Sequence, residues 1–327
     1  MQVGLDTFTI RELELDPFAT LTFLREHGLE GAQFGGVRSL SPTLDPGALQ
    51  EVRQEADRLG LYTHVSVPTC NPHLVGGSLE DHYAEFVRQI EAAAACGWHE
   101  LHSSLGGGPE RYEHPVRWTQ HLADSAAFIR RLGPVLRHHG SRVNLETHGD
   151  TTTFELVRLI EDVGPAIAGI CLDTANVLCH AEDPVAAARR AAPYTHLTHL
   201  KDGILYFSEN GYVRQGKAPG QGCLDWERIL PVLGEYQPQL PLSIEDHKWL
   251  FEFAIFDPWW LSLHPDLTCE ELAQVVKLVW QCERRIAAGE LPDPAEYEAI
   301  PYLDQMEERL HFGRDYLIGV LERRGLR

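Results

Sequence analysis

The chain has 327 residues, of which 43% are hydrophobic, and a formal net charge of −20. A charge of that sign argues against a nucleic-acid partner, because nucleic-acid binding neutralises phosphates with Lys and Arg. No apolar run reaches the ~20 residues that a membrane-spanning helix needs, so we expect no membrane association either.

The first residues, MQVGLDTF, read directly as a strand and lack the basic and apolar segments of a signal peptide, so we expect a cytoplasmic protein. The seven cysteines are widely spaced and form no CxxC motif. We therefore expect reduced thiols and not a disulfide or zinc framework.

Strand and helix patterns alternate along the chain, as a β/α barrel requires. Short apolar runs predict strands at 2–8, 31–35, 62–67, 100–105, 142–147, 167–173, 195–201 and 241–246. Helical patterns occupy 78–97, 115–139, 226–235, 269–288 and 294–326, and Ser78 and Gly97 are expected to cap the first of these.

These elements predict an α/β fold, a (β/α)8 TIM barrel with a C-terminal helical extension. The chain exceeds the ~250 residues typical of such a barrel, which leaves room for an extension but not for a second full domain. We place the barrel in residues 1–290, with 269–288 as its last helix, and the extension in 291–327.

Four successive strands each end on a charged or imidazole side chain: Glu146, Asp173, His199 and Glu245. Side chains alternate along a strand, and in VNLETH the apolar residues share one face while Glu146 lies with the polar residues on the other. A single such carboxylate is more often a helix cap or a solvated loop charge. Four at matching positions instead predict a metal site at one mouth of the barrel.

The ligand types indicate the chemistry. A mostly oxygen set with one imidazole suits one divalent cation, Mn²⁺ first and Mg²⁺ or Co²⁺ as alternatives, better than a structural zinc. Such a cation can polarise a carbonyl and stabilise an enediolate. Glu146 and Glu245 come from strands on different sides of the site, so they could be the catalytic acid/base pair on opposite faces of a sugar carbon.

Together with HLKD at 199–202 and GQGCLDW at 220–226, this order of ligands resembles the xylose isomerase-like TIM-barrel superfamily of sugar isomerases and epimerases, which is related to the endonuclease IV branch. The likeness covers roughly residues 1–290. It implies metal ligation by Glu146, Asp173, His199 and Glu245. It does not define one reaction, because members include ketose 3-epimerases, hydroxypyruvate isomerase, inosose dehydratase and sugar-acid decarboxylases. We also expect a homo-oligomer, a dimer or a tetramer.

One departure from the epimerases concerns Asn176, in the segment DTAN. The ketose epimerases have a histidine there that helps to bind a substrate oxygen. An amide can donate a hydrogen bond but cannot carry a proton. Asn176 could bind substrate or cap the helix after the sixth strand, and its presence favours the lyase branches.

Other polar residues near strand ends could also bind substrate: His64, His102, His148 and Lys201. A strand histidine is as often a satisfied core residue, and Lys201 could either orient a substrate carboxylate or enolate or form a salt bridge. Asp6 is a weaker candidate. We assign Asp202 a structural role and expect Asp225 to cap the helix that follows it.

After the eighth strand, the segment 248–266 is rich in aromatic side chains: Trp249, Phe251, Phe253, Phe256, Trp259 and Trp260. The alternatives are an aromatic wall of the site, a lid, a subunit contact or an extra helix packed on the barrel. Sugar faces stack on such rings, which agrees with the wall.

The leading hypothesis is a metal-dependent isomerase or epimerase that acts on a small ketose or keto-polyol through a metal-stabilised enediolate. The alternative is a lyase with the same metal and base, which dehydrates a keto-inositol or sugar acid or decarboxylates a 3-oxo sugar acid. A phosphodiesterase on damaged DNA is a distant third, because the net charge repels that substrate. A non-catalytic sugar-binding barrel is the remaining class, although binding alone needs no complete metal set.

Overall fold

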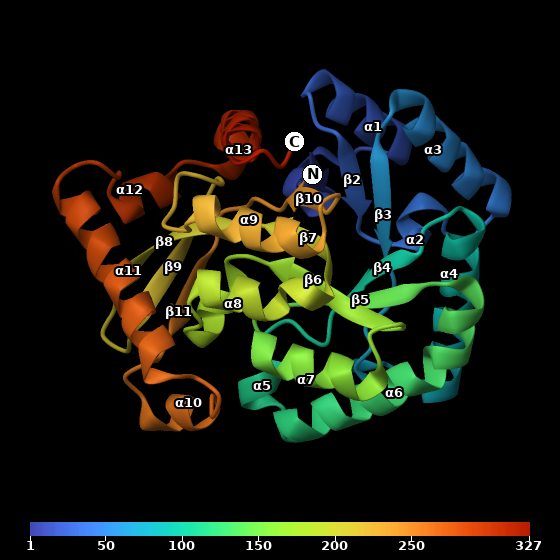
Figure 1. Cartoon of the computed structure of the whole chain (residues 1–327), viewed down its shortest axis with the longest axis horizontal. Coiled ribbons are helices and arrows are strands. Elements are labelled where there is room, and N and C mark those ends of the chain that lie inside the picture. Colours follow the sequence, from blue (N-terminus) through green and yellow to red (C-terminus); the bar gives the residue numbers. More distant parts are fainter.

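The computed structural model describes all 327 residues and shows a closed barrel of eight parallel strands in the order β1-β10-β7-β6-β5-β4-β3-β2 (Figure 1). All eight predicted barrel strands are confirmed, with ends that differ by a few residues. Their bounds are β1 Gln2–Asp6, β2 Gly31–Phe34, β3 Tyr62–Ser66, β4 Glu100–Ser103, β5 Arg142–Glu146, β6 Ala168–Asp173, β7 Thr195–Leu200 and β10 Pro241–Ile244.

Helices cover the outside of the barrel and also a second, smaller sheet that is described below. The α-helices are α1 Pro17–Glu26, α2 Val37–Leu40, α3 Pro46–Leu59, α4 Leu79–Ala95, α5 Glu110–Glu113, α6 Trp118–His139, α7 Thr153–Val163, α8 Pro184–Ala191, α9 Trp226–Tyr236, α10 Pro258–Ser262, α11 Cys269–Ala287, α12 Pro294–Ala299 and α13 Tyr302–Arg324. The 3-10 helices are η1 Thr7–Leu13, η2 Pro72–Leu74, η3 Asn176–His180 and η4 Ala192–Tyr194. The predicted cap of α4 is confirmed, since the Ser78 side chain accepts hydrogen bonds from two backbone N–H groups of the first turn.

Our sequence patterns did not predict a second sheet of three antiparallel strands, β8 Asp202–Phe207, β9 Tyr212–Lys217 and β11 Leu250–Phe253. The hairpin β8–β9 follows β7, and β11 follows β10 and pairs with β9. Residues 208–211 form the tip of the hairpin, where the Ser208 N–H donates to the Gly211 carbonyl. The dipeptide Asn210–Gly211 between two apolar runs is a hairpin signal that could have revealed it.

The helices near the C-terminus correct one assignment. The helix α11 packs on β8 of the small sheet, whereas α13 packs on β1, β10 and α9 (Figure 1). The position beside the first and eighth barrel strands therefore belongs to α13, and 269–288 is not the last barrel helix as predicted. The predicted extension 294–326 is two helices, because Ile300 and Pro301 interrupt it. The domain boundary at residue 290 stays a prediction.

A buried ion pair connects α13 to the segment directly after β10, which contains Glu245. The Arg309 side chain donates to both oxygens of Asp246 at 2.8 and 2.5 Å, and each of the two residues is 3% exposed. The segment after β10 is therefore fixed from outside by α13.

We expect Arg309→Met to lower the free energy of unfolding by about 3–5 kcal/mol, because it leaves the Asp246 carboxylate buried and unpaired. Arg323→Met on the same helix is the matched control, since Arg323 pairs with Glu227 at the surface and should contribute nothing measurable. Denaturant unfolding of both variants measures the difference. An equal loss in both would contradict the role of the buried pair, and Asp246→Asn combined with Arg309→Met should recover part of the stability.

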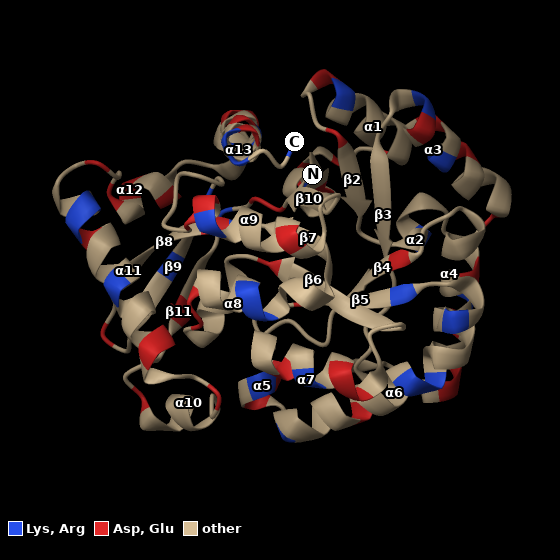
Figure 2. Ribbon diagram, viewed as in Figure 1, with Lys and Arg blue, Asp and Glu red and all other residues tan.

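Charged residues of both signs are distributed along the helices of the outer layer (Figure 2). None of the helices combines the length and apolar character needed to cross a membrane.

Candidate functional site

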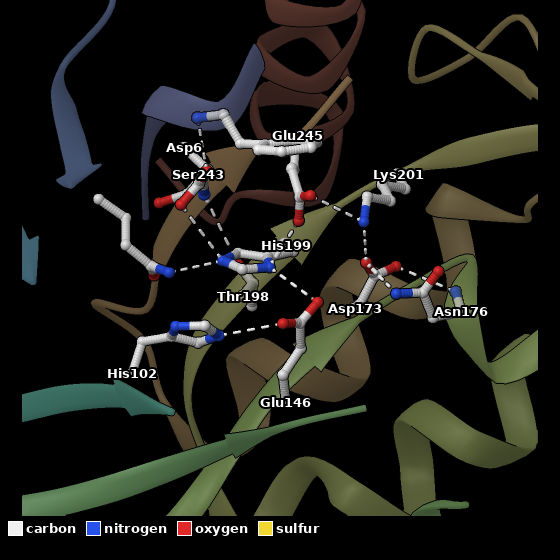
Figure 3. A network of polar contacts seen from close by, with 12 residues as sticks. Asp6, His102, Glu146, Asp173, Asn176, Thr198, His199, Lys201, Ser243 and Glu245 are labelled. Atoms are coloured by element: carbon white, nitrogen blue, oxygen red, sulfur yellow. Dashed lines mark hydrogen bonds and ion pairs between the residues drawn. The ribbon is translucent and has the colours of Figure 1, made fainter. Parts of the chain in front are cut away.

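The four strand-end residues meet at one mouth of the barrel (Figure 3). Glu146 and Asp173 are the last residues of β5 and β6, His199 is on β7, and Glu245 directly follows β10. All four are buried, and one ligand atom from each lies within 4.8 Å of the others. They meet because the carboxyl ends of parallel strands lie at the same mouth of a barrel.

The contacts within this group converge on the His199 ring. Nδ1 of His199 lies 3.1 Å from Glu146 Oε1 and 2.6 Å from Glu245 Oε2. Glu245 Oε2 is nevertheless buried without a hydrogen-bond partner, so the short distance lacks hydrogen-bond geometry. This carboxylate oxygen lacks a partner and lies close to possible ligand atoms of the three other residues. Such an arrangement fits a bound cation.

The charge of the group also fits a cation. Four buried carboxylates lie in and beside the group. Those of Asp6, Glu146 and Glu245 contact His199, and those of Asp173 and Glu245 pair with the ammonium of Lys201. Burial opposes ionisation of Glu146, but the neighbouring histidines, His199 first, hold the pKa of that carboxyl well below its ordinary value. A concentration of buried negative charge is costly unless a cation offsets it.

A second group of possible ligands, His102, Cys171 and His199, lies beside the first. Burial raises the pKa of the Cys171 thiol to about 12. A protonated thiol is a poor ligand, so the carboxylate group is the candidate metal site.

Lys201 and Asn176 hold the carboxylates in place. Lys201 Nζ lies 2.7 Å from Asp173 Oδ2 and 2.9 Å from Glu245 Oε1, so it forms the salt bridge that was one of the two predicted roles. Asn176 donates from Nδ2 to Asp173 Oδ2 at 2.7 Å and accepts from Arg214 Nη1 at 2.9 Å. Both also line the cavity above the site. Asn176 is the first residue of η3 and not its side-chain cap.

The predicted histidines separate into two classes. His102 donates from Nε2 to Glu146 Oε2 at 3.1 Å, and its Nδ1 contacts Ser66 Oγ at 2.9 Å. His148 lines the same cavity, and its Nδ1 is buried without a partner. His64 lies deeper in the barrel against the Tyr62 ring and does not line the cavity. Ser66 and His64 are two residues apart on the same face of β3. Ser66, at the end of the strand, lines the cavity, whereas His64 does not.

The predicted structural role of Asp202 is confirmed. Its carboxylate accepts hydrogen bonds from the backbone N–H groups of Gly220 and Cys223 and from the Trp226 ring. A Cβ atom at Gly222 would collide with this carboxylate, which explains a glycine there. Asp225 occupies the predicted N-cap position of α9, but its side chain makes no capping hydrogen bond. The buried Asp202 already organises the turn.

Gln33, near the end of β2, is a site residue that the sequence analysis did not predict. Its amide contacts His199 Nε2 and so affects which ring nitrogen carries the proton. The Gln33 amide nitrogen lies 2.6 Å from His199 Nε2, while Gln33 Oε1 is buried without a partner. Turning the amide by half a rotation fits the same atoms and places Oε1 opposite Nε2–H, where it can accept a hydrogen bond from the ring. With Nε2 held by Gln33, Nδ1 is the His199 nitrogen that faces the carboxylates and would bind a cation there. A polar residue in the apolar run GAQF was the available sequence signal.

We expect Gln33→Leu to weaken binding of Mn²⁺ by roughly 10–100-fold, because the ring of His199 loses the acceptor that fixes its tautomer. Gln33→Glu keeps an oxygen acceptor and should retain most of the affinity. Calorimetric titration of both metal-free variants measures the effect. Equal affinities in the two variants would contradict this role for Gln33.

A cavity of about 790 Å³ opens above the four residues. Its floor carries Glu146, His199 and Glu245. Its outer part is lined by aromatic side chains from η1, α5, β11 with the residue before it, and α10: Phe8, Tyr112, Trp249, Phe251, Phe253, Trp259 and Trp260. The aromatic segment after the eighth strand therefore forms a wall of the cavity, in β11 and the short helix α10.

The comparison with protein families matches residues 21–252 to the xylose isomerase-like TIM barrel. The chain is 24% identical over 231 residues to the uncharacterized protein YihM of Escherichia coli (strain K12), a match that covers 68% of this chain and 65% of that protein. It is also 22% identical over 230 residues to 3-oxo-isoapionate decarboxylase of Pectobacterium atrosepticum, covering 70% of this chain and 74% of the decarboxylase.

Among solved structures, the fold is similar to that of D-psicose 3-epimerase with D-tagatose from Clostridium cellulolyticum H10. The TM-score is 0.67, and the alignment covers 98% of this chain and 99% of the epimerase. At 15% identity this likeness shows the shared fold alone.

Proposed function

The chain belongs to the xylose isomerase-like TIM barrel family, and from that membership we propose that it is a divalent-cation-dependent isomerase or epimerase of a keto sugar or keto-polyol. One observation carries the proposal. Glu146 and Glu245 come from β5 and β10, which are separated by two strands in the barrel, yet both reach Nδ1 of His199. Two carboxylates thus approach one point at the cavity floor from different sides.

We propose Glu146, Asp173, His199 and Glu245 as the ligands of one cation, Mn²⁺ or alternatively Mg²⁺ or Co²⁺, because the set is rich in oxygen. When bound, the cation supplies Lewis-acid polarisation of the substrate carbonyl. One glutamate, as the carboxylate, removes the proton from the neighbouring carbon and is protonated by it. The other glutamate first takes up a proton from solvent and then gives it to the resulting enediolate.

Further residues of the cavity support this chemistry. The hydrogen bond from His102 orients the Glu146 carboxylate. Burial opposes the charge of Glu245, but the ammonium of Lys201 holds the pKa of that carboxyl below its ordinary value. We propose that Lys201, Asn176, His102 and His148 bind the substrate oxygens. His64 is left out of this set because it does not line the cavity.

A lyase is the second candidate, and Asn176 is the observation that favours it. Its amide is engaged by Asp173 and Arg214 and cannot carry a proton to or from a second substrate oxygen. The resemblance to a 3-oxo sugar-acid decarboxylase agrees with this alternative. Loss of carbon dioxide or water from a keto sugar acid also leads through an enolate.

Incubation of the Mn²⁺-loaded protein in deuterated water with ketoses, inososes and 3-oxo sugar acids tests both candidates. Product of unchanged composition with solvent deuterium at the carbon next to the carbonyl supports the isomerase or epimerase. A product that has lost water or carbon dioxide supports the lyase and contradicts the isomerase or epimerase. Absence of both changes with every substrate contradicts the proposed function.

We also propose that the protein is a homo-oligomer, a dimer or a tetramer. Large apolar side chains outside the cavity, such as Tyr236, Trp280 and Phe312, are 42–52% exposed. Analytical ultracentrifugation measures the oligomeric state.

A further inference from the structure

We propose that the substrate is a glycoside in which the keto sugar is joined to a flat, uncharged second ring, and that this ring binds in the aromatic outer part of the cavity. The inference rests on the function proposed above and narrows its substrate class. It extends the substrate beyond the small, free ketose that the sequence suggested.

The size of the cavity is the first observation. Its volume of about 790 Å³ lies in the upper part of the range of ~300–1,000 Å³ found for pockets that enclose drug-sized ligands. The side chains of Glu146, His199 and Lys201, which are proposed to act on the sugar, lie together at the floor. A single sugar ring at that floor leaves the outer part of the same cavity unfilled.

The arrangement of the aromatic rings is the second observation. Phe8 and Trp249 meet edge to face, with ring centroids 5.5 Å apart, and Tyr112 and Trp259 meet at 6.3 Å. The rings come from four separate parts of the chain that converge around the opening: Phe8 is in η1, Tyr112 in α5 and Trp259 in α10, and Trp249 directly precedes β11. Trp249 and Trp259 remain 42% and 54% exposed, so the chain itself does not cover them. Exposed rings that surround the mouth of a cavity are suited to stack on a ligand.

Charge excludes a phosphate as the second group. The cavity is lined by five carboxylates, including Glu113 and Glu252 in its outer part, and by two cations, Lys201 and Arg214. Lys201 is paired with two carboxylates, and Arg214 is hydrogen-bonded to Asn176 with its guanidinium 4.9 Å from the Phe251 ring centre. The outer part therefore repels an anion and favours an uncharged ring.

The test compares the phenyl and methyl glycosides of one keto sugar, 3-oxo-glucose, by calorimetric titration of the Mn²⁺-loaded protein. We expect the phenyl glycoside to bind about tenfold more tightly, which corresponds to 1.4 kcal/mol. Trp259→Ala should abolish most of this preference without changing the affinity for the methyl glycoside. Trp280→Ala is the matched control, because Trp280 is 52% exposed on α11, does not line this cavity and should leave the preference intact.

Equal affinities of the wild-type protein for the two glycosides would overturn the inference. A Trp259→Ala variant that loses affinity for both glycosides alike, or tighter binding of a phosphorylated keto sugar, would overturn it as well. Deuterium exchange into the methyl glycoside is measured separately. Exchange without a preference for the phenyl glycoside rejects the inference but supports the proposed function. A preference for the phenyl glycoside without exchange supports the aromatic subsite but contradicts the proposed function.

Discussion

Replacement of either glutamate by glutamine, Glu146→Gln or Glu245→Gln, is expected to lower turnover by roughly 10²-fold or more while the fold persists. Glutamine has nearly the shape of glutamate but no basic oxygen that could accept the substrate proton. Both side chains are already fixed by neighbours, Glu146 by His102 and Glu245 by Lys201, so the loss reflects chemistry and not a change of position.

Steady-state kinetics with the substrate identified by mass spectrometry measures this effect. The metal content of each variant is determined in parallel, because both glutamates also belong to the candidate metal site. Glu252→Gln is the matched control, since Glu252 lines the outer part of the cavity on β11 and should keep turnover near the wild-type value. Full activity of either variant with metal bound would remove that glutamate from the acid/base role.

Removal of the cation is expected to abolish activity, and reconstitution should restore it with about one ion per chain, as a single four-ligand site requires. His199→Ala and Asp173→Ala should each lose the ion, because each leaves three donors around the remaining buried negative charge. The cation should also raise the melting temperature of the wild-type protein, because it binds only the folded site.

Elemental analysis after dialysis measures the ion in each variant. His64→Ala is the control, because His64 is a strand histidine outside the cavity and should leave the metal content unchanged. Retention of the ion in all four single alanine variants of Glu146, Asp173, His199 and Glu245 would reject the assignment.

The strand-end rule that identified the candidate metal ligands applies to Gln33 as well, but it did not lead us to predict a role for this residue. Its position at the end of β2 follows the same rule that identified Glu146, but an uncharged amide in an apolar run has no chemistry of its own to draw attention. Its importance appears only when His199, 166 residues later, is placed against it. Arg214 was missed for another reason, since it is on a hairpin that we had not predicted.

The sequence by itself determined the eight barrel strands and the four residues at the candidate metal site. Strand periodicity is a local property, and a parallel β/α barrel places every strand end at one mouth, so position along the strand is enough to predict that these side chains meet. The ligand types, mostly carboxylate oxygen, then indicate the class of cation without further geometry.

Only the tertiary structure decided the rest of the cavity. The strand β11 pairs with β9 across more than thirty residues of sequence, and α13 rather than α11 packs against β1 and β10. Such choices depend on which distant surfaces bury each other, and local patterns of polarity do not specify the partner. The same long-range pairing brings Arg214 and the aromatic rings of β11 to the cavity above the candidate metal site, so the shape of this cavity became visible only in the folded chain.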